Sequence, residues 1–477
     1  MAGAREDHVG TRGAPARRRP SRSLRAPIAP ARRCAYAVLR RVFEQGAYAD
    51  RALQAEAQGL DARDRALAMR LAYGAVQRKG TLDHLIALLS ERPVARLDAP
   101  VLAALRLGLY ELLYLRGAPD RAVVADGVEL VKANARAGDG LVNAVLRRAA
   151  REGRGLLDGL DEQTPERAAI KHSHPLWIAR LWWQELGERD ARTLMAYDNE
   201  PGEVALRANT LVTDAPALAR ELAAGDPARG TPPVRTHADP DIPEALVLDD
   251  ALDVRALPAW RRGAFMAQSR AAMLVAHLLA PRAGERVLDL CAAPGGKSTH
   301  LAALMDGTGE VVAVERDRRR AGELARGVRR LHASSVRVEL ADAAAPRPEG
   351  AVFDRVLVDP PCSGLGTLQA RPDLRWRMTP ARLAELERAQ AEILAAGAGA
   401  VRPGGMLVYS TCTLSPTENE RRIAAFLAAN PAFALDDLRA QPAALRRSWP
   451  RMPETVLTLP HRDRTAGFFI ARLRREG

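Results

Sequence analysis

The sequence contains little cysteine and no long apolar run. Four cysteines occur in 477 residues, without a C-x-x-C pair or a cluster of cysteine and histidine. This spacing argues against a disulfide framework and against a structural zinc site, so we expect reduced thiols and no bound metal. A membrane-spanning helix needs about 18 consecutive apolar residues, and no such run is present. Residues 1–33 also lack the apolar stretch of a secretory signal, so we expect a cytoplasmic protein with no membrane partner.

Lysine is scarce too, because only four of the 71 basic residues are lysines. The formal net charge is +13, and clustered basic side chains release counterions when they bind nucleic-acid phosphates. A chain rich in Arg, Ala, Gly and Pro is also typical of a GC-biased coding sequence, which raises arginine everywhere. Charge alone therefore leaves nucleic-acid binding open. Residues 1–30, rich in Arg, Pro and Ser, predict a disordered basic tail.

Residues 31–155 have a helical pattern throughout. In the segment CAYAVLRRVFEQG the apolar residues recur at helical spacing: Ala35, Val38, Leu39, Val42 and Phe43. Gly46 then predicts the end of the helix. The segment VLAALRLGLYELLYL repeats the stripe, and no strand signal interrupts it. The pattern predicts an all-α bundle, which by itself names no function.

Residues 165–255 have a mixed pattern that predicts a small α+β domain. The segment HPLWIARLWWQELG predicts a helix with Pro175 near its first turn. Its three tryptophans could stack on RNA bases, but core positions are favoured: Trp177, Trp182 and Trp183. Short strands are predicted in EVALRAN and EALVLDD. The Pro-, Gly- and Asp-rich residues 225–243 between them predict a surface loop.

Residues 264–477 alternate between strand-like and helical segments. Five near-continuous apolar runs have the length of strands: RVLDL, EVVAVE, VRVELAD, DRVLVD and GMLVYST. Such runs are typical of buried parallel strands, so this part predicts a doubly wound, Rossmann-like α/β domain. Ligands of such domains bind at the carboxyl ends of the strands.

A glycine-bearing turn follows the first of these strands. In VLDLCAAPGGKSTHLA, Gly295 and Gly296 would let a ligand approach the backbone at a helix start. The G-x-G-x-x-G of a dinucleotide site is absent, which disfavours a nicotinamide enzyme. Acidic residues end the next strands, at Glu315, Asp342 and Asp359. Carboxylates suited to ribose hydroxyls and to an adenine amine favour S-adenosylmethionine as the cofactor.

Two cysteines, Cys362 and Cys412, follow the fourth and fifth strands. These strands are normally neighbours, so both thiols should face the methyl end of the cofactor. Cys34 is expected to be a core residue, and Cys291 to line the glycine loop rather than react.

A thiolate that adds to carbon 6 of a pyrimidine makes carbon 5 nucleophilic enough to take a methyl group. Asp359, if protonated or acting through hydrogen bonds, would absorb charge on the N3 side of the ring. A second thiol could assist proton removal or product release. The residues alone leave open which cysteine attacks.

Three segments resemble the RNA 5-methylcytosine methyltransferases: LDLCAAPGGKSTHLA, DPPCSGLGTLQARPDLRW and YSTCTLSPTENE. Four helical segments resemble the domain similar to the antitermination factor NusB in the bacterial methyltransferase B subgroup (Sun/Fmu): AYAVLRRVFEQGAYAD, RALAMRLAYGAVQRKGTLDHLI, LRLGLYELLYL and GLVNAVLRR.

The resemblance implies that Cys412 is the nucleophile and that Cys362 assists release of the product. It also implies that the cofactor is bound by a set of ten residues, which comprises Cys291, Ala292, Ala293, Pro294, Gly295, Gly296, Lys297, Glu315, Asp342 and Asp359.

Two differences from the family pattern are the proline at position 360 and the AQSR segment at 267–270, where the family often has an acidic residue after the glutamine. We expect no functional consequence at the first and claim no site at the second.

We therefore expect a monomeric enzyme that uses S-adenosylmethionine to methylate carbon 5 of a cytosine in small-subunit (16S) ribosomal RNA. The resemblance implies that residues 31–155 and 165–255 bind RNA, and we expect residues 1–150 to add affinity and target choice without touching the chemistry.

Three alternatives remain: a transfer-RNA methyltransferase, an amino-group methyltransferase related by its DPPC motif, and a non-catalytic RNA-binding antitermination protein. Both cysteines and the whole glycine loop argue against the last.

Overall fold

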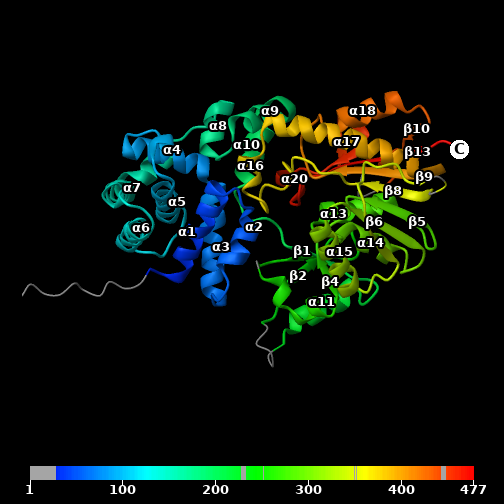
Figure 1. The fold of residues 1–477 in the computed structure, drawn as a ribbon, viewed down its shortest axis with the longest axis horizontal. Coiled ribbons are helices and arrows are strands. Elements are labelled where there is room, and N and C mark those ends of the chain that lie inside the picture. The colour runs from blue at the N-terminus through cyan, green and yellow to red at the C-terminus, as the bar shows by residue number, and fades with distance from the viewer. Residues whose placement is uncertain (1–27, 227–231, 251, 349, 351, 442–446) are drawn as a thin grey trace, which may run out of the picture.

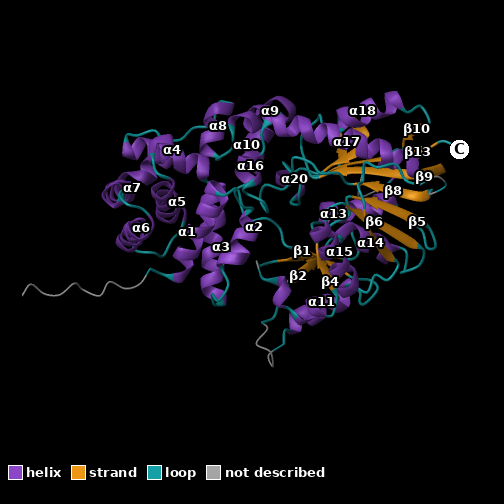
Figure 2. Ribbon diagram, in the orientation of Figure 1, coloured by secondary structure: helices purple, strands orange, loops and turns teal. Residues whose placement is uncertain are grey.

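The computed structural model describes residues 28–226, 232–250, 252–348, 350, 352–441 and 447–477 (Figure 1). The predicted basic tail, residues 1–30, lies almost entirely outside these residues. A helical bundle lies at one end of the molecule, and the strands gather at the other end (Figure 2). No helix in the described part of the chain is long and apolar enough to cross a membrane.

The N-terminal bundle confirms the all-helical prediction. It consists of seven helices and one 3₁₀ turn: α1 (Pro30–Glu44), α2 (Ala49–Glu56), α3 (Ala62–Gln77), α4 (Lys79–Ser90), η1 (Val94–Arg96), α5 (Ala99–Tyr114), α6 (Asp120–Asn134) and α7 (Asp139–Asp158). In α1 the predicted stripe lies in the bundle core, together with the buried Cys34. The helix ends at Glu44, two residues before Gly46, whose φ of +65° suits glycine.

Three short helices connect the bundle to the rest of the chain: α8 (Pro165–Lys171), α9 (Leu176–Leu186) and α10 (Glu188–Tyr197). As predicted, α9 begins directly after Pro175. Trp182 is fully buried, which confirms its core position, whereas Trp177 and Trp183 are partly buried. This part of the chain packs against the core of the C-terminal domain rather than forming a core of its own.

A small antiparallel sheet follows, with the strand order β2-β3-β1-β4. Its elements are β1 (Ala205–Ala208), α11 (Ala215–Ala224), β2 (Thr236–Ala238), β3 (Ala245–Leu248), η3 (Val254–Ala256), α12 (Pro258–Arg261) and β4 (Phe265–Ala267). β1 and β3 are the two predicted strands. The prediction of a loop over residues 225–243 is wrong at β2. An exposed edge strand needs no apolar pattern, so the sequence of β2 carries no strand signal.

The C-terminal sheet confirms the five predicted strands and their parallel order. They are β5 (Arg286–Leu290), β6 (Glu310–Glu315), β7 (Val336–Leu340), β8 (Phe353–Val358) and β9 (Val401–Thr411), and they lie in the order β9-β8-β5-β6-β7. The sheet is mixed rather than wholly parallel, because four further strands pair antiparallel beyond β9: β10 (Phe433–Leu435), β11 (Ser448–Trp449), β12 (Met452–Leu457) and β13 (Phe469–Arg475).

Helices cover both faces of this sheet. Val287 of β5 packs on the side of α13 (Arg270–Leu279), α14 (Gly296–Leu304) and α15 (Arg318–Arg330). Its neighbour Leu288 packs on the opposite side with α17 (Pro380–Ala400) and α18 (Glu420–Ala429), as the period of a strand requires. Figure 1 shows these two helical layers. The remaining short elements are α16 (Leu374–Arg377), η4 (Leu438–Ala440) and α20 (Pro460–Asp463).

Candidate active site

The two cysteine loops follow neighbouring strands. β8 and β9 are parallel and adjacent, with Val358 paired to Tyr409 near their carboxyl ends. Cys362 lies on the loop after β8, and Cys412 directly follows β9. Their Sγ atoms are 3.2 Å apart, within hydrogen-bond distance for sulfur. Both thiols are partly exposed. The structure therefore brings together the pair that the sequence predicted to meet at this edge of the sheet.

The residues after the two cysteines tie the loops together. The hydroxyl oxygens of Ser363 and Thr413 are 2.6 Å apart. The buried carboxylate of Glu418 accepts hydrogen bonds from the Ser363 N–H at 2.8 Å and from Gln390 Nε2 at 2.9 Å. This support was not predicted from the sequence, although Ser363, Thr413 and Glu418 lie within the motifs that carry the resemblance; Gln390 lies outside them.

The C-terminal loop also packs on the cysteine loops. The Gly366 N–H donates to the carbonyl of Cys412 at 3.0 Å, and the Gly467 N–H donates to the carbonyl of Gly366 at 2.7 Å. A Cβ at Gly366 would lie 2.0 Å from the carbonyl oxygen of Gly467, so no larger residue fits. Residues near 467 are therefore part of the frame that holds Cys412.

Asp359 links the cysteine loops to the glycine loop. Lys297 Nζ lies 2.5 Å from Asp359 Oδ2, and Ser410 Oγ donates to Asp359 Oδ1 at 2.9 Å. Burial would lower the pKa of Lys297, but the Asp359 carboxylate outweighs burial and raises it. Lys297 therefore stays an ammonium ion beside the thiols.

The pKa values of the two thiols are shifted in opposite directions. The hydrogen bond from Cys362 lowers the pKa of Cys412. Burial and the charge of Asp359 act in the opposite direction, and the cations Arg371 and Lys297 add to the lowering. Donating that hydrogen bond raises the pKa of Cys362, and burial and the charge of Glu418 add to the rise. These directions favour Cys412 as the thiolate of the pair and Cys362 as the thiol.

Residues 291–297 form the predicted turn between β5 and α14. Cys291 and Gly295 have φ angles of +66° and +100°, and a Cβ at Gly295 would lie 2.5 Å from Leu324 Cδ1. α14 begins at Gly296, so the N–H groups of its first turn have no acceptor within the helix. Burial raises the pKa of Cys291 to about 12, so this thiol ionises less readily than a free one.

The three strand-end carboxylates lie on three strands of one sheet edge. Glu315 ends β6, is 3% exposed and accepts the N–H of Asp317 at 2.9 Å. Asp342 follows β7, is exposed and accepts the N–H of Ala344 at 3.0 Å. Asp359 alone contacts the glycine loop. The structure thus joins Asp359 to the cysteines and leaves Glu315 and Asp342 further along the edge.

Two buried side chains beneath the glycine loop were not predicted. Asp289 of β5 accepts a hydrogen bond from Ser298 Oγ at 2.6 Å, and burial raises its pKa to about 7. Arg207 of β1 is fully buried and donates to the carbonyl of Gly296 and to Thr299 Oγ1 at 3.0 Å. The signal was a charged residue inside each apolar run, in RVLDL and in EVALRAN.

One group of described residues has the donor types of a metal site: Glu244, His277 and His300. Their potential ligand atoms lie within 4.8 Å of one another. Both imidazoles reach the same carboxylate oxygen, Glu244 Oε1, at 2.7 Å and 2.5 Å. These are hydrogen-bond distances, so the carboxylate holds both rings. His300 Nδ1 is buried and has no hydrogen-bond partner among the described residues. The contacts join the small sheet to α13 and α14.

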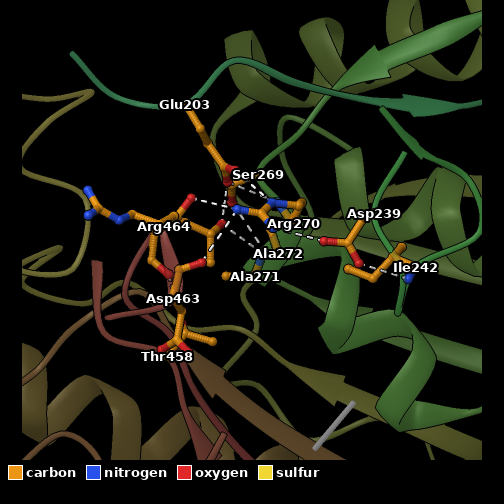
Figure 3. A network of polar contacts seen from close by, with 12 residues as sticks. Glu203, Asp239, Ile242, Ser269, Arg270, Ala271, Ala272, Thr458, Asp463 and Arg464 are labelled. Atoms are coloured by element: carbon orange, nitrogen blue, oxygen red, sulfur yellow. Dashed lines mark hydrogen bonds and ion pairs between the residues drawn. The ribbon is translucent and has the colours of Figure 1, made fainter. Parts of the chain in front are cut away.

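A second polar network joins the small sheet, α13 and the C-terminal loop (Figure 3). Arg270 donates to Glu203 Oε2 and to Asp239 Oδ2, both at 2.8 Å, and to the carbonyl of Arg464 at 2.6 Å. Thr465 Oγ1 donates to the other oxygen of Glu203. Arg270 belongs to the AQSR segment, at which no site was predicted, and its hydrogen bonds join the small sheet to the C-terminal loop.

Comparison with protein families covers both ends of the chain. The NusB family matches residues 29–151, and the 16S rRNA methyltransferase RsmB/F family matches residues 276–474. The crystal structure of PH0851 superposes with a TM-score of 0.79 at 26% identity, covering 95% of this chain and 100% of that one.

Two curated relatives extend over nearly the whole chain. A probable ribosomal RNA small subunit methyltransferase B from Synechocystis sp. is 37% identical over 458 residues, which are 93% of this chain and 99% of that protein. Another from Bacillus subtilis is 33% identical over 427 residues, which are 88% of this chain and 92% of that protein. Identity at this level along both the bundle and the cysteine-bearing domain confirms the resemblance, and the chain belongs to the family of ribosomal RNA small subunit methyltransferase B.

Proposed function

We propose that this protein transfers a methyl group from S-adenosylmethionine to carbon 5 of a cytosine in small-subunit (16S) ribosomal RNA. The observation that carries the proposal is the 3.2 Å contact between Cys362 and Cys412. The ion pair between Asp359 and Lys297 connects the loop of Cys362 to the glycine loop. The relatives named for methylation of small-subunit ribosomal RNA supply the substrate class.

The residues of the sheet edge suit the cofactor. The glycine loop offers N–H groups and a close approach to the backbone at the start of α14, and Glu315 and Asp342 offer carboxylates for hydroxyl and amine groups. S-Adenosylmethionine has no phosphate groups, so it does not require the third glycine of a dinucleotide-binding loop. S-Adenosylmethionine supplies an electrophilic methyl group and leaves as a neutral thioether.

Cys412 is the proposed nucleophile. Its thiolate adds to carbon 6 of cytosine, an S–C bond forms, and the electrons of the C5–C6 double bond move to carbon 5, which takes the methyl group. A base then takes the carbon-5 proton, the electrons of that C–H bond re-form the C5–C6 double bond, and the S–C bond breaks so that the thiolate leaves. The depressed pKa of Cys412 favours the form that attacks.

Cys362 and Asp359 have the supporting roles in this scheme. Cys362 holds a proton 3.2 Å from the attacking sulfur, so it can stabilise the departing thiolate during elimination. Asp359, fixed by Lys297 and Ser410, is assigned to the N3 edge of the base, where as a protonated carboxyl it would donate a hydrogen bond to N3 as negative charge develops in the adduct. A cytosine must leave its stack to reach this site, so an unpaired target is expected.

The test is methyl transfer from labelled S-adenosylmethionine to small-subunit RNA that lacks modification, followed by nucleoside analysis. We expect 5-methylcytosine and no labelled 4-methylcytosine, with Cys412→Ala as the inactive control. Label in N4-methylcytosine, or label in transfer RNA alone, would contradict the proposal.

A further inference from the structure

The short helix α16 contacts both the core of the catalytic domain and the core of the N-terminal bundle. Its first residue, Leu374, packs in the core of the catalytic domain. Two residues later, Trp376 packs against the core of the N-terminal bundle. Figure 1 shows α16 between these two parts of the molecule. It follows the loop of Cys362 directly in the chain, so it connects that loop physically to the bundle.

Arg375 anchors the helix from within. Its side chain is fully buried and donates to the carbonyls of Ser173 at 3.1 Å and Asp198 at 3.0 Å, and to Asn199 Oδ1 at 3.0 Å. Burial lowers its pKa to about 10, so it remains charged at neutral pH. A buried guanidinium with this many acceptors fixes the position of its backbone.

Trp376 is held by the junction between α3 and α4. Its Nε1–H donates to the carbonyl of Val76 at 2.7 Å, in the last turn of α3. The ammonium group of Lys79 lies 4.8 Å from its ring centroid. A Cβ on Gly80 would lie 2.9 Å from the outer edge of the ring, so the bundle fits this side chain without spare room.

The other end of α16 touches the loop of Cys362. A Cβ at Gly364 would lie 2.8 Å from Leu374 Cδ1, and Gly364 has a φ of +70° that disfavours other residues. The loop closes on itself through the Thr367 N–H, which donates to the carbonyl of Gly364 at 2.9 Å, and through the Arg371 N–H, which donates to the carbonyl of Thr367 at 3.0 Å. A shift of α16 is therefore transmitted to Cys362 and Arg371.

We propose that Trp376 is a positioning residue through which the N-terminal bundle holds the Cys362 loop against Cys412. The bundle then sets the rate of the chemical step as well as the affinity for RNA. This inference rests on the proposed function for its reaction, and it departs from the sequence-based expectation that residues 1–150 leave the chemistry untouched.

The reactivity of Cys412 reports the position of that loop. The charged and titratable groups that act on its thiol are Cys362 and Arg371 from the loop, Lys297 from α14, and Asp359 from the end of β8. Two of these four move with α16. Displacement of the loop weakens the hydrogen bond from Cys362 and removes the nearby cation, and both changes disfavour the thiolate.

The experiment compares two alanine substitutions in the full chain. Gly80→Ala places a methyl group against Trp376, whereas Gly140→Ala places one where nothing lies within 4 Å. Both glycines are the second residue of a bundle helix, and neither has a positive φ. Alanine favours a helix over glycine at both positions, so both variants should fold.

Two readouts are measured: the pH dependence of Cys412 alkylation by iodoacetamide, mapped by mass spectrometry, and kcat and KM for small-subunit RNA. In Gly80→Ala we expect the alkylation midpoint to rise by about one pH unit and kcat to fall about tenfold, with KM changed less. Gly140→Ala should match the wild type. In a Trp376→Phe background, which removes the crowding atoms, Gly80→Ala should add little further effect.

Equal alkylation profiles and equal kcat in the two folded glycine variants would overturn the inference. If Gly80→Ala does not fold, Trp376→Phe serves alone, because it removes the hydrogen bond to Val76, and an unchanged profile there has the same meaning. Alkylation needs neither RNA nor cofactor, so the profile tests this inference even if the label appears on another base. If the wild type forms 5-methylcytosine but the two glycine variants have equal alkylation profiles, this inference is wrong and the proposed function stands.

Discussion

The loops after β8 and β9 are alike in form and opposite in electrostatics. Each places a cysteine at the carboxyl end of a parallel strand, and a hydroxyl residue follows each cysteine. Arg371 and Lys297 lower the pKa of Cys412 against Asp359, whereas Glu418 and Asp359 both raise the pKa of Cys362. Two thiols 3.2 Å apart therefore differ in acidity. The comparison teaches that position in the sheet brings the two thiols together, while the hydrogen bond between them and the neighbouring charges favour Cys412 as the thiolate.

Removal of the attacking thiol should have the largest effect. We expect Cys412→Ala to lower methyl transfer by about 10⁴-fold or more, because the covalent route is lost. Binding of S-adenosylmethionine should persist, since residues 291–297 form a separate element; calorimetry checks this. A variant that retains appreciable turnover would remove Cys412 as the nucleophile.

Removal of the cation beside Cys412 should have the next largest effect. In Lys297→Met the pKa of Cys412 should rise, and kcat at pH 7 should fall about 10- to 100-fold at saturating cofactor. Part of the loss should return as the pH is raised, because the thiolate then forms without help. Lys297→Arg keeps the charge and is the matched control. A loss that is the same at every pH would show that Lys297 acts by another route.

Neutralising the carboxylate on the other side should weaken the asymmetry. Glu418→Gln keeps the shape of a side chain that accepts from Ser363 and Gln390, and it removes the charge that disfavours a Cys362 thiolate. We expect iodoacetamide to label Cys362 at lower pH than in the wild type, with a fall in kcat of about threefold. An unchanged labelling profile would mean that burial alone keeps Cys362 protonated.

The smallest effect on activity is expected at Asp289, whose influence is on stability. Burial raises its pKa to about 7 from the ordinary value of 3.8. A carboxyl with a raised pKa contributes stability that is present below pH 4 and is lost as the pH rises through 7. Asp289→Asn should therefore gain stability relative to the wild type across this range, by up to about 4 kcal/mol. Urea unfolding at pH 4.5 and pH 8 checks the sign, which would be reversed if the ionised carboxyl were stabilised.

The strands and the cysteine pair were predictable because their signals are local. Apolar runs of strand length predict β5 to β9, and the two cysteines lie just beyond β8 and β9. The antiparallel strands β10 to β13 were not predicted, since their segments mix arginine and proline with apolar residues. β13 pairs over six positions with β9, a partner about 60 residues away in the chain that no local pattern reveals.

Contacts between segments that are distant in the chain could not be predicted either. Arg375 lies in a motif that the sequence singled out, but its acceptors come from Ser173, Asp198 and Asn199. Arg207 lies in a predicted strand, yet its partner is the carbonyl of Gly296. A buried charge inside an apolar segment signals that a partner exists, and only the fold identifies the partner.

The central claim is that Cys412 attacks and that Cys362 assists release, and trapping of the covalent intermediate tests it most directly. Cys362→Ala, Cys412→Ala and the double variant are incubated with S-adenosylmethionine and unmodified small-subunit RNA, then resolved on a denaturing gel. We predict a protein–RNA band of reduced mobility in Cys362→Ala, because addition proceeds while elimination slows, and no band in the other two. A band in Cys412→Ala and none in Cys362→Ala would contradict the account and make Cys362 the nucleophile.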